Sequence, residues 1–68
     1  MTFHIVQLGP GSNERIVHEK SYATLQEARG RASREIEAFE GEHGYDTLRG
    51  YWWCRDRRGR TRFIFVVD

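Results

Sequence analysis

The chain has 68 residues, 11 of them basic and 10 acidic, and a formal net charge of +1. This length allows one domain, residues 1–68, which buries only about 60% of the surface of its unfolded form. The single cysteine excludes an internal disulfide framework, and the histidine spacing gives no zinc signature, so we expect no metal or other cofactor. No apolar run approaches the ~18 residues of a membrane span, and residues 1–20 lack a signal peptide's apolar core, so we expect a cytoplasmic location.

The charges are sorted along the chain. Residues 35–46 contain five acids and no Lys or Arg, whereas residues 49–62 contain six arginines and one aspartate. Arginine accounts for ten of the 11 basic residues, and its planar guanidinium suits carboxylates and phosphates. Two interpretations follow: both runs are solvated surface, or the arginine-rich half contacts an anionic partner.

The first part of the chain predicts a β-hairpin. Residues 2–8 alternate between two sides, residues 9–13 form a turn cluster, and residues 14–20 resume an extended pattern. With the five turn residues as the loop, the predicted pairs are Val6 with Ile16, Ile5 with Val17 and His4 with His18.

A helix is predicted to begin at Thr24. Thr24 and Glu27 have the spacing of a capping box. Apolar residues then recur at steps of three and four, and two alanines in mid-stripe indicate close approach to a sheet. Gly41 and Gly44 are the predicted stop, and acidic residues near this end oppose the helix dipole, which favours a basic neighbour. The apolar stripe consists of Leu25, Ala28, Ala32, Ile36 and Phe39.

A second hairpin is predicted around the turn Asp56–Gly59, with Gly59 as the left-handed residue of a bulge. Its register pairs Asp56 with Arg60, Trp53 with Phe63, Trp52 with Ile64 and Tyr51 with Phe65. One face then carries Tyr51, Trp53, Phe63, Phe65 and Val67, and the other carries Trp52, Cys54, Ile64 and Val66. Both faces are apolar.

These elements predict an α+β domain: a four-stranded antiparallel sheet with one helix packed on one face, in ββαββ order. One helix covers one face of such a sheet. The second apolar face has three explanations: self-association into a homodimer, binding of another macromolecule, or cover from flanking loops.

A catalytic constellation is hard to assemble from these residues. Cys54 is predicted mid-strand among aromatics, where a cysteine behaves as a small buried hydrophobe. His4 and His18 could begin a metal site, but no third ligand lies near them in the sequence. We therefore expect a protein that is not an enzyme.

Nucleic acid is one candidate partner. Basic β-ribbons enter the major groove, and aromatics beside guanidinium groups stack on single-stranded bases. The sequence pI of about 8.0 is lower than is usual for dedicated DNA-binding domains. The arginines of this candidate site are Arg55, Arg57, Arg58, Arg60 and Arg62, beside Tyr51, Trp52 and Trp53.

Three further segments carry a family resemblance. They are Ala28-Arg29-Gly30-Arg31-Ala32-Ser33-Arg34-Glu35 after Thr24 and Leu25, then Gly50-Tyr51-Trp52-Trp53, and Gly59-Arg60. With the ββαββ order and the similar length, they resemble small phage-encoded anti-CRISPR proteins of the ninth type I-F inhibitor family. The resemblance spans most of the chain, although the matched residues are few.

The resemblance implies a non-enzymatic inhibitor in the host cytoplasm. Such proteins bind a crRNA-guided surveillance complex along its backbone subunits and block hybridisation of target DNA. Basic helix residues make those contacts, and the matching positions are Arg29 and Arg34. A third basic position falls on Gly30, a departure for which the adjacent Arg31 could substitute. The acidic run from residue 35 to 46 has no counterpart in the family.

The helix arginines also have a structural explanation. Arg31 has i,i+4 spacing to both Glu27 and Glu35, and such pairs contribute only ~0.3–0.5 kcal/mol each. The leading hypothesis is an anti-CRISPR-type inhibitor that occupies the nucleic-acid-binding surface of its target. The alternatives are a stand-alone nucleic-acid-binding domain using the second hairpin and a homodimeric interaction module.

Overall fold

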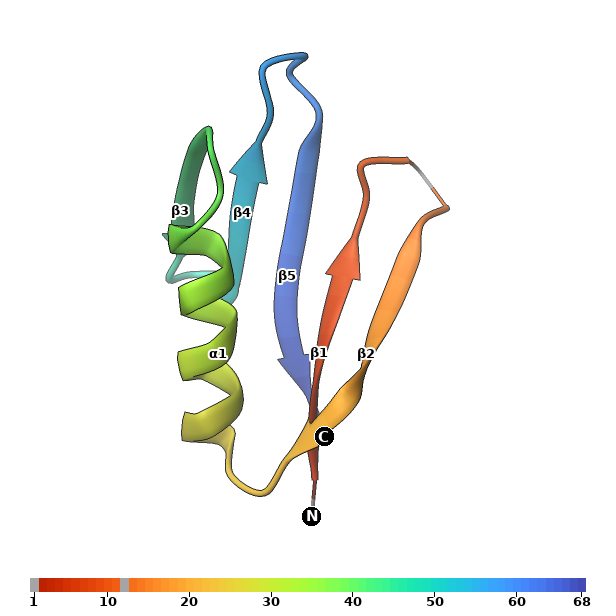
Figure 1. Cartoon of the computed structure of the whole chain (residues 1–68), viewed down its shortest axis with the longest axis vertical. Coiled ribbons are helices and arrows are strands. Elements are labelled where there is room, and N and C mark those ends of the chain that lie inside the picture. The colour runs from red at the N-terminus through yellow and green to blue at the C-terminus, as the bar shows by residue number, and fades with distance from the viewer. Residues whose placement is uncertain (1, 12) are drawn as a thin grey trace.

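A computed structural model describes residues 2–11 and 13–68, which form one helix and a five-stranded antiparallel sheet (Figure 1). The strands lie in the order β2-β1-β5-β4-β3. The predicted α+β class is confirmed, but the sheet has five strands rather than four. The elements are β1 (Phe3–Leu8), β2 (Arg15–Tyr22), α1 (Leu25–Glu37), β3 (Glu42–Asp46), β4 (Tyr51–Arg55) and β5 (Thr61–Val67).

The unpredicted strand is β3, within the acidic run. Its sequence, Glu-His-Gly-Tyr-Asp, is poor in the β-branched residues that favour strands, and it pairs along one side only, with β4. The helix ends at its C-cap Ala38, and Gly44 lies inside the strand instead of stopping the helix. As a result Glu42 lies opposite Arg55 in the β3–β4 pair. Its carboxylate is therefore part of the sheet and does not lie at the C-terminal end of the helix.

The start and buried side of α1 follow the sequence pattern. The Thr24 hydroxyl accepts from the Glu27 backbone N–H at 3.2 Å and donates to the Glu27 carboxylate at the same distance. Ala28 and Ala32 are fully buried, which confirms the close approach of the helix to the sheet. Leu25, predicted to fill one end of the stripe, is 45% exposed because it lies in the first turn.

The helix covers one face of the sheet, which carries the main core. This core joins Ile36 of the helix to Ile5, Trp52, Cys54 and Ile64 of the strands. Alternation directs their sequence neighbours to the opposite face, and no helix lies against that face in the part of the chain described (Figure 1). We call this surface the uncovered face; its β4 and β5 residues are Tyr51, Trp53, Phe63, Phe65 and Val67.

The register of the second hairpin is confirmed where β4 and β5 pair. Trp52 lies opposite Ile64 and Trp53 opposite Phe63. At the turn, the Asp56 N–H donates to the Arg60 carbonyl at 3.0 Å, and Gly59 has a φ of +78°. The Asp-to-Gly turn therefore sets the pairing as the sequence indicates.

The predicted register of the first hairpin is wrong. Val6 pairs with Val17 rather than Ile16, and an irregularity between His4 and Val6 shifts the pairing so that His4 faces Ser21. The irregularity changes the number of β2 residues opposite β1, which turn length alone does not reveal. The predicted turn includes residue 12, which lies outside the described residues.

Gly30 offers a test of helix stability. A Cβ built at this position meets nothing within 4 Å, so alanine fits without a clash. Glycine in a helix interior costs about 1 kcal/mol relative to alanine. We expect Gly30→Ala to raise the free energy of unfolding by about 1 kcal/mol, and Tm by about 4–8 °C, in thermal and urea unfolding.

The opposite result is expected at Ala32, which is fully buried against the sheet. Ala32→Leu should lower the free energy of unfolding by about 1–3 kcal/mol through overpacking. If Gly30→Ala proved as destabilising as Ala32→Leu, the open surroundings of Gly30 would be contradicted.

Candidate binding surfaces

Arg29, one of the candidate contact residues, is exposed and contacts other side chains of the protein. Its guanidinium Nη2 donates to the Tyr45 hydroxyl at 2.9 Å. Its Cζ lies 5.4 Å from the centroid of the Tyr45 ring and 5.3 Å from that of Trp52, within cation–π range. The two rings also contact each other, with centroids 4.8 Å apart. Arg29 therefore ties α1 to β3 and β4.

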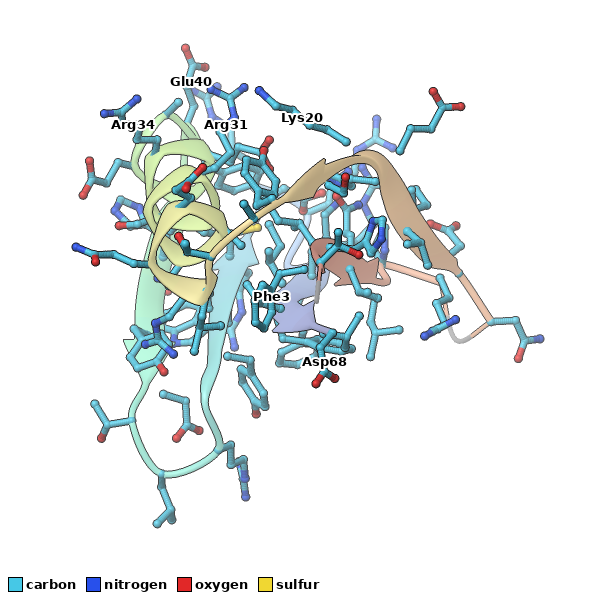
Figure 2. All side chains as sticks on the ribbon, turned by 90° about the horizontal axis from the view of Figure 1, so that it is seen from below. Phe3, Lys20, Arg31, Arg34, Glu40 and Asp68 are labelled. Carbon is cyan, nitrogen blue, oxygen red and sulfur yellow. The ribbon has the colours of Figure 1, made fainter. Side chains whose placement is uncertain are left out.

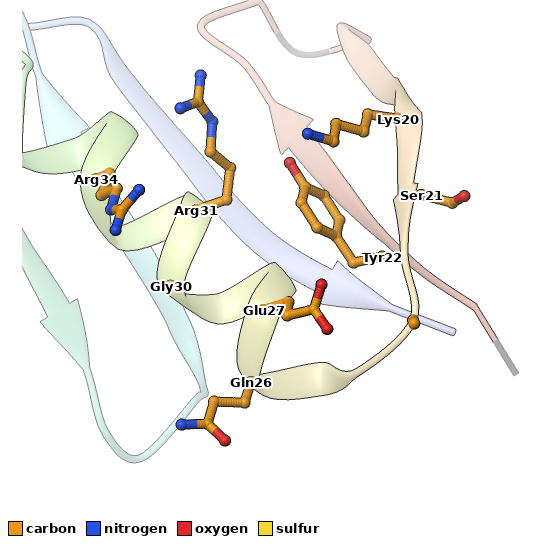
Figure 3. A pocket seen from close by; sticks show the side chains of 9 residues that line it. Lys20, Ser21, Tyr22, Gln26, Glu27, Gly30, Arg31 and Arg34 are labelled. Atoms are coloured by element: carbon orange, nitrogen blue, oxygen red, sulfur yellow. The ribbon is translucent and has the colours of Figure 1, made fainter.

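Arg31 and Arg34 lie on a different side of α1 from Arg29. With Lys20 of β2 they line a groove between the helix and that edge strand, with a volume of about 500 Å³ (Figure 3). Figure 2 shows the same three cations along one side of the molecule. We call this the cationic groove; it is lined by Lys20, Ser21, Tyr22, Ala23, Gln26, Glu27, Gly30, Arg31 and Arg34.

The three cations of the groove differ in their contacts. Arg31 Nε lies 3.4 Å from a Glu35 carboxylate oxygen, and its side chain is 53% exposed. This confirms the expected i,i+4 pair of Arg31 with Glu35. The Glu27 carboxylate, the other expected partner of Arg31, instead accepts a hydrogen bond from the Thr24 hydroxyl. Within residues 2–11 and 13–68, the Arg34 side chain is exposed and makes no ion pair or hydrogen bond. Arg34 can therefore bind a partner without breaking an internal contact.

The arginines of the second hairpin are unequally engaged. Arg60 Nε donates to Asp56 Oδ2 at 2.8 Å. Arg55 donates through Nε to Thr61 Oγ1 at 3.4 Å, and its Nη1 lies 4.0 Å from a Glu42 oxygen. The side chains of Arg57 and Arg58 are exposed and have no ionic partner in the described part of the chain. Arg62 is half-buried, with its Cζ 6.0 Å from the centroid of the Phe39 ring. The exposed arginines of this hairpin that have no ionic partner in the described residues are therefore those at its tip.

The Asp56 carboxylate organises that tip. Oδ1 accepts backbone N–H groups from Arg58 at 2.9 Å and from Arg60 at 3.0 Å. The pKa of Asp56 is lowered, first by the Arg60 backbone N–H, with further contributions from the Arg60 side chain and the Arg58 N–H. The ionised carboxylate is therefore the form that stabilises the turn.

The aromatic residues of the uncovered face are half-buried and in contact. The Tyr51 and Phe63 rings meet edge to face, with centroids 4.9 Å apart. The Trp53 indole lies across Gly44 of β3: a Cβ built on Gly44 would be 3.0–3.1 Å from three adjacent ring atoms. Gly44 therefore provides the space that lets the indole rest on the sheet.

The candidate reactive and metal-binding residues are not brought together. Cys54 is 2% exposed, and burial raises the pKa of its thiol. His18, expected opposite His4, instead has Nδ1 3.9 Å from a Glu35 oxygen on the helix. Among residues 2–11 and 13–68, no three His, Cys, Asp or Glu side chains are grouped as metal ligands. The helix α1 of the described residues is not long and apolar enough to cross a membrane.

Two features of these surfaces were missed by sequence reasoning. Lys20 joins the groove only because β2 lies beside the helix in space, and nothing in its own segment indicates this. Gly44 was read as a helix stop, although its pairing with Trp53 gives it a role in the sheet.

Comparison with known proteins adds no relative. No family model, no curated protein and no solved structure matches the chain.

The burial of Cys54 predicts slow thiol chemistry. In native buffer at about pH 8, its reaction with a disulfide reagent should be at least ~100-fold slower than in urea, because the protein must open first. Stopped-flow absorbance measures both rates. Equal rates in the two conditions would contradict the buried, protonated thiol.

The lowered pKa of Asp56 predicts a pH-dependent contribution to stability. The contribution is fully present above 3.8, the ordinary pKa of an aspartate, and is lost as the pH falls through the lower pKa of Asp56 in the folded protein. We expect the loss of stability caused by Asp56→Ala to be larger at pH 7 than at about pH 2, measured by urea unfolding. Asp68→Ala, which removes an exposed carboxylate near the chain end, is the matched control. A pH-independent difference at Asp56 would contradict the prediction.

Proposed function

We propose that this protein is a small non-enzymatic inhibitor of the anti-CRISPR type, which occupies the nucleic-acid-binding surface of a crRNA-guided complex. The observation that carries the proposal is the cationic groove, where Lys20, Arg31 and Arg34 line one depression from two separate elements. The resemblance of the helix segment to type I-F inhibitors supports the choice of target.

The groove suits a phosphate-bearing partner. A complex that presents a guide RNA exposes a row of phosphates, and guanidinium groups bind phosphate through two parallel hydrogen bonds. Arg34 is available at once, whereas Arg31 must exchange its contact with Glu35. That contact is partly exposed, and exposed ion pairs contribute only ~0.2–1 kcal/mol, so the exchange is inexpensive. The bound inhibitor then excludes target DNA by occupying space.

The three helix arginines have different roles in this proposal. Arg34 and Arg31 contact the partner. Arg31 takes the place of the basic residue that the type I-F inhibitors have at the position of Gly30. Arg29 instead supports the surface through Tyr45 and Trp52. Arg29 is exposed, but its contacts hold the guanidinium against Tyr45 and Trp52, on a different side of the helix from the groove, so we assign it no direct contact.

Charge reversal in the groove tests the proposal. The double variant Arg31→Glu/Arg34→Glu should bind a purified type I-F surveillance complex, loaded with guide RNA, at least tenfold more weakly than the wild type. This factor corresponds to about 1.4 kcal/mol, less than the loss of two charged hydrogen bonds. Biolayer interferometry measures the affinity, and a gel-shift assay measures the block of target-DNA hybridisation.

The matched control is Arg57→Glu/Arg58→Glu, which makes the same change of charge at the far hairpin. It should weaken binding less than Arg31→Glu/Arg34→Glu does, because the two positions lie outside the groove. No binding by the wild type, or equal losses in the two double variants, would overturn the proposal.

A further inference from the structure

The uncovered face has an ordered aromatic surface that the proposed function does not use. It lies on the side of the sheet opposite the helix, and its central rings come from the paired strands β4 and β5. Val17 extends the apolar surface onto β2 and is 45% exposed. Partly exposed aromatic side chains on an open sheet can stack with planar ligands.

Trp53 is packed against β3 and is partly exposed. Three adjacent atoms of the indole, Cζ2, Nε1 and Cε2, are nearly equidistant from the Cβ position of Gly44. The indole therefore packs against the backbone of Gly44. Trp53 is only partly buried, so part of its ring is accessible on the uncovered face.

The charges around this face favour an anionic ligand. Three carboxylates beside it are each within 4.0 Å of an arginine: Asp56 with Arg60, Glu42 with Arg55, and Asp46 with Arg49. Arg57 and Arg58 at the hairpin tip are exposed and have no ionic partner among residues 2–11 and 13–68. The tip extends past the C-terminal end of α1 (Figure 1), so the helix does not cover it.

We propose that the uncovered face binds single-stranded nucleic acid. Bases stack on Trp53 and the neighbouring Phe63, and the backbone phosphates lie against Arg57 and Arg58. Stacking of bases on aromatic residues within a positively charged groove is the general mode of sequence-tolerant single-strand binding. A duplex does not fit this mode, because its bases are already stacked on each other. The inference does not depend on the inhibitor proposal, which uses the other side of the molecule.

The test is a titration of 5′-fluorescein-labelled dT12 with the full chain, followed by fluorescence anisotropy at low salt. We expect saturable binding, quenching of tryptophan fluorescence, and an affinity that falls as salt rises because phosphate contacts release counterions. A blunt duplex of the same length should bind at least about fivefold more weakly, since its bases are not free to stack.

Three variants separate stacking, charge and the other surface. Trp53→Leu, which retains an apolar side chain, should weaken binding about tenfold. Arg57→Glu/Arg58→Glu should weaken it by at least as much and reduce its salt dependence. Arg31→Glu/Arg34→Glu, the same change of charge in the cationic groove, should weaken binding less than Arg57→Glu/Arg58→Glu does, because the groove lies on the other side of the sheet from the stacking residues.

Gly44→Ala gives a further variant in which no ligand-contacting side chain is removed. Its methyl group would lie 3.0–3.1 Å from the indole and would shift the ring by a few tenths of an ångström, so dT12 binding should fall by about twofold to threefold. Circular dichroism checks that each variant is folded.

Several outcomes would overturn the inference. One is the absence of dT12 binding by folded wild type; another is duplex binding as tight as single-strand binding. A third is a dimer in sedimentation velocity that Trp53→Leu dissociates, which would assign the face to a second copy. The inhibitor proposal stands or falls separately, because its binding loss belongs to Arg31 and Arg34.

Discussion

The close contact between α1 and the sheet is the constraint on which the rest of this structure depends. Ala28 and Ala32 are fully buried, and their small side chains allow the helix backbone to approach the strands. Ile36 can then join Trp52 and Ile64 in one core. The described residues form one helix, which covers one face of the sheet. The aromatic residues on the opposite face therefore remain half-buried.

Arg29 shows how a cation can serve the fold in so small a protein. The aromatic pair Tyr45 and Trp52 lies at the flank of the helix, and the guanidinium contacts both rings. This contact also joins the edge strand β3 to the helix, although β3 has little burial of its own. Arg29, which the family resemblance marks as a partner contact, therefore also contacts other side chains of the protein. Arg34 makes no ion pair or hydrogen bond through its side chain within residues 2–11 and 13–68.

The division of charge gives the molecule two separate cationic surfaces. The acidic residues of β3 and the hairpin turn neutralise Arg55 and Arg60, and Glu35 contacts Arg31. Among the exposed cations without an ionic partner in residues 2–11 and 13–68 are Arg34 beside the groove and the pair Arg57 and Arg58 at the hairpin tip. A net charge of +1 thus conceals two local positive fields, which lie at different places on the molecule.

The sequence by itself determined the local structure. The Thr24 cap, the alanine stripe and the Asp56–Gly59 turn each depend on residues a few positions apart, and the structure contains all three. Tertiary structure decided what depends on distant pairing. The strand β3 forms because β4 supplies its hydrogen bonds, and the β2 irregularity sets which residues face β1. The groove likewise needs Lys20 and Arg34 from separate elements, and Arg29 finds its rings 16 and 23 positions away. Short-range patterns do not encode these contacts, because the energies that select them come from packing across the whole domain.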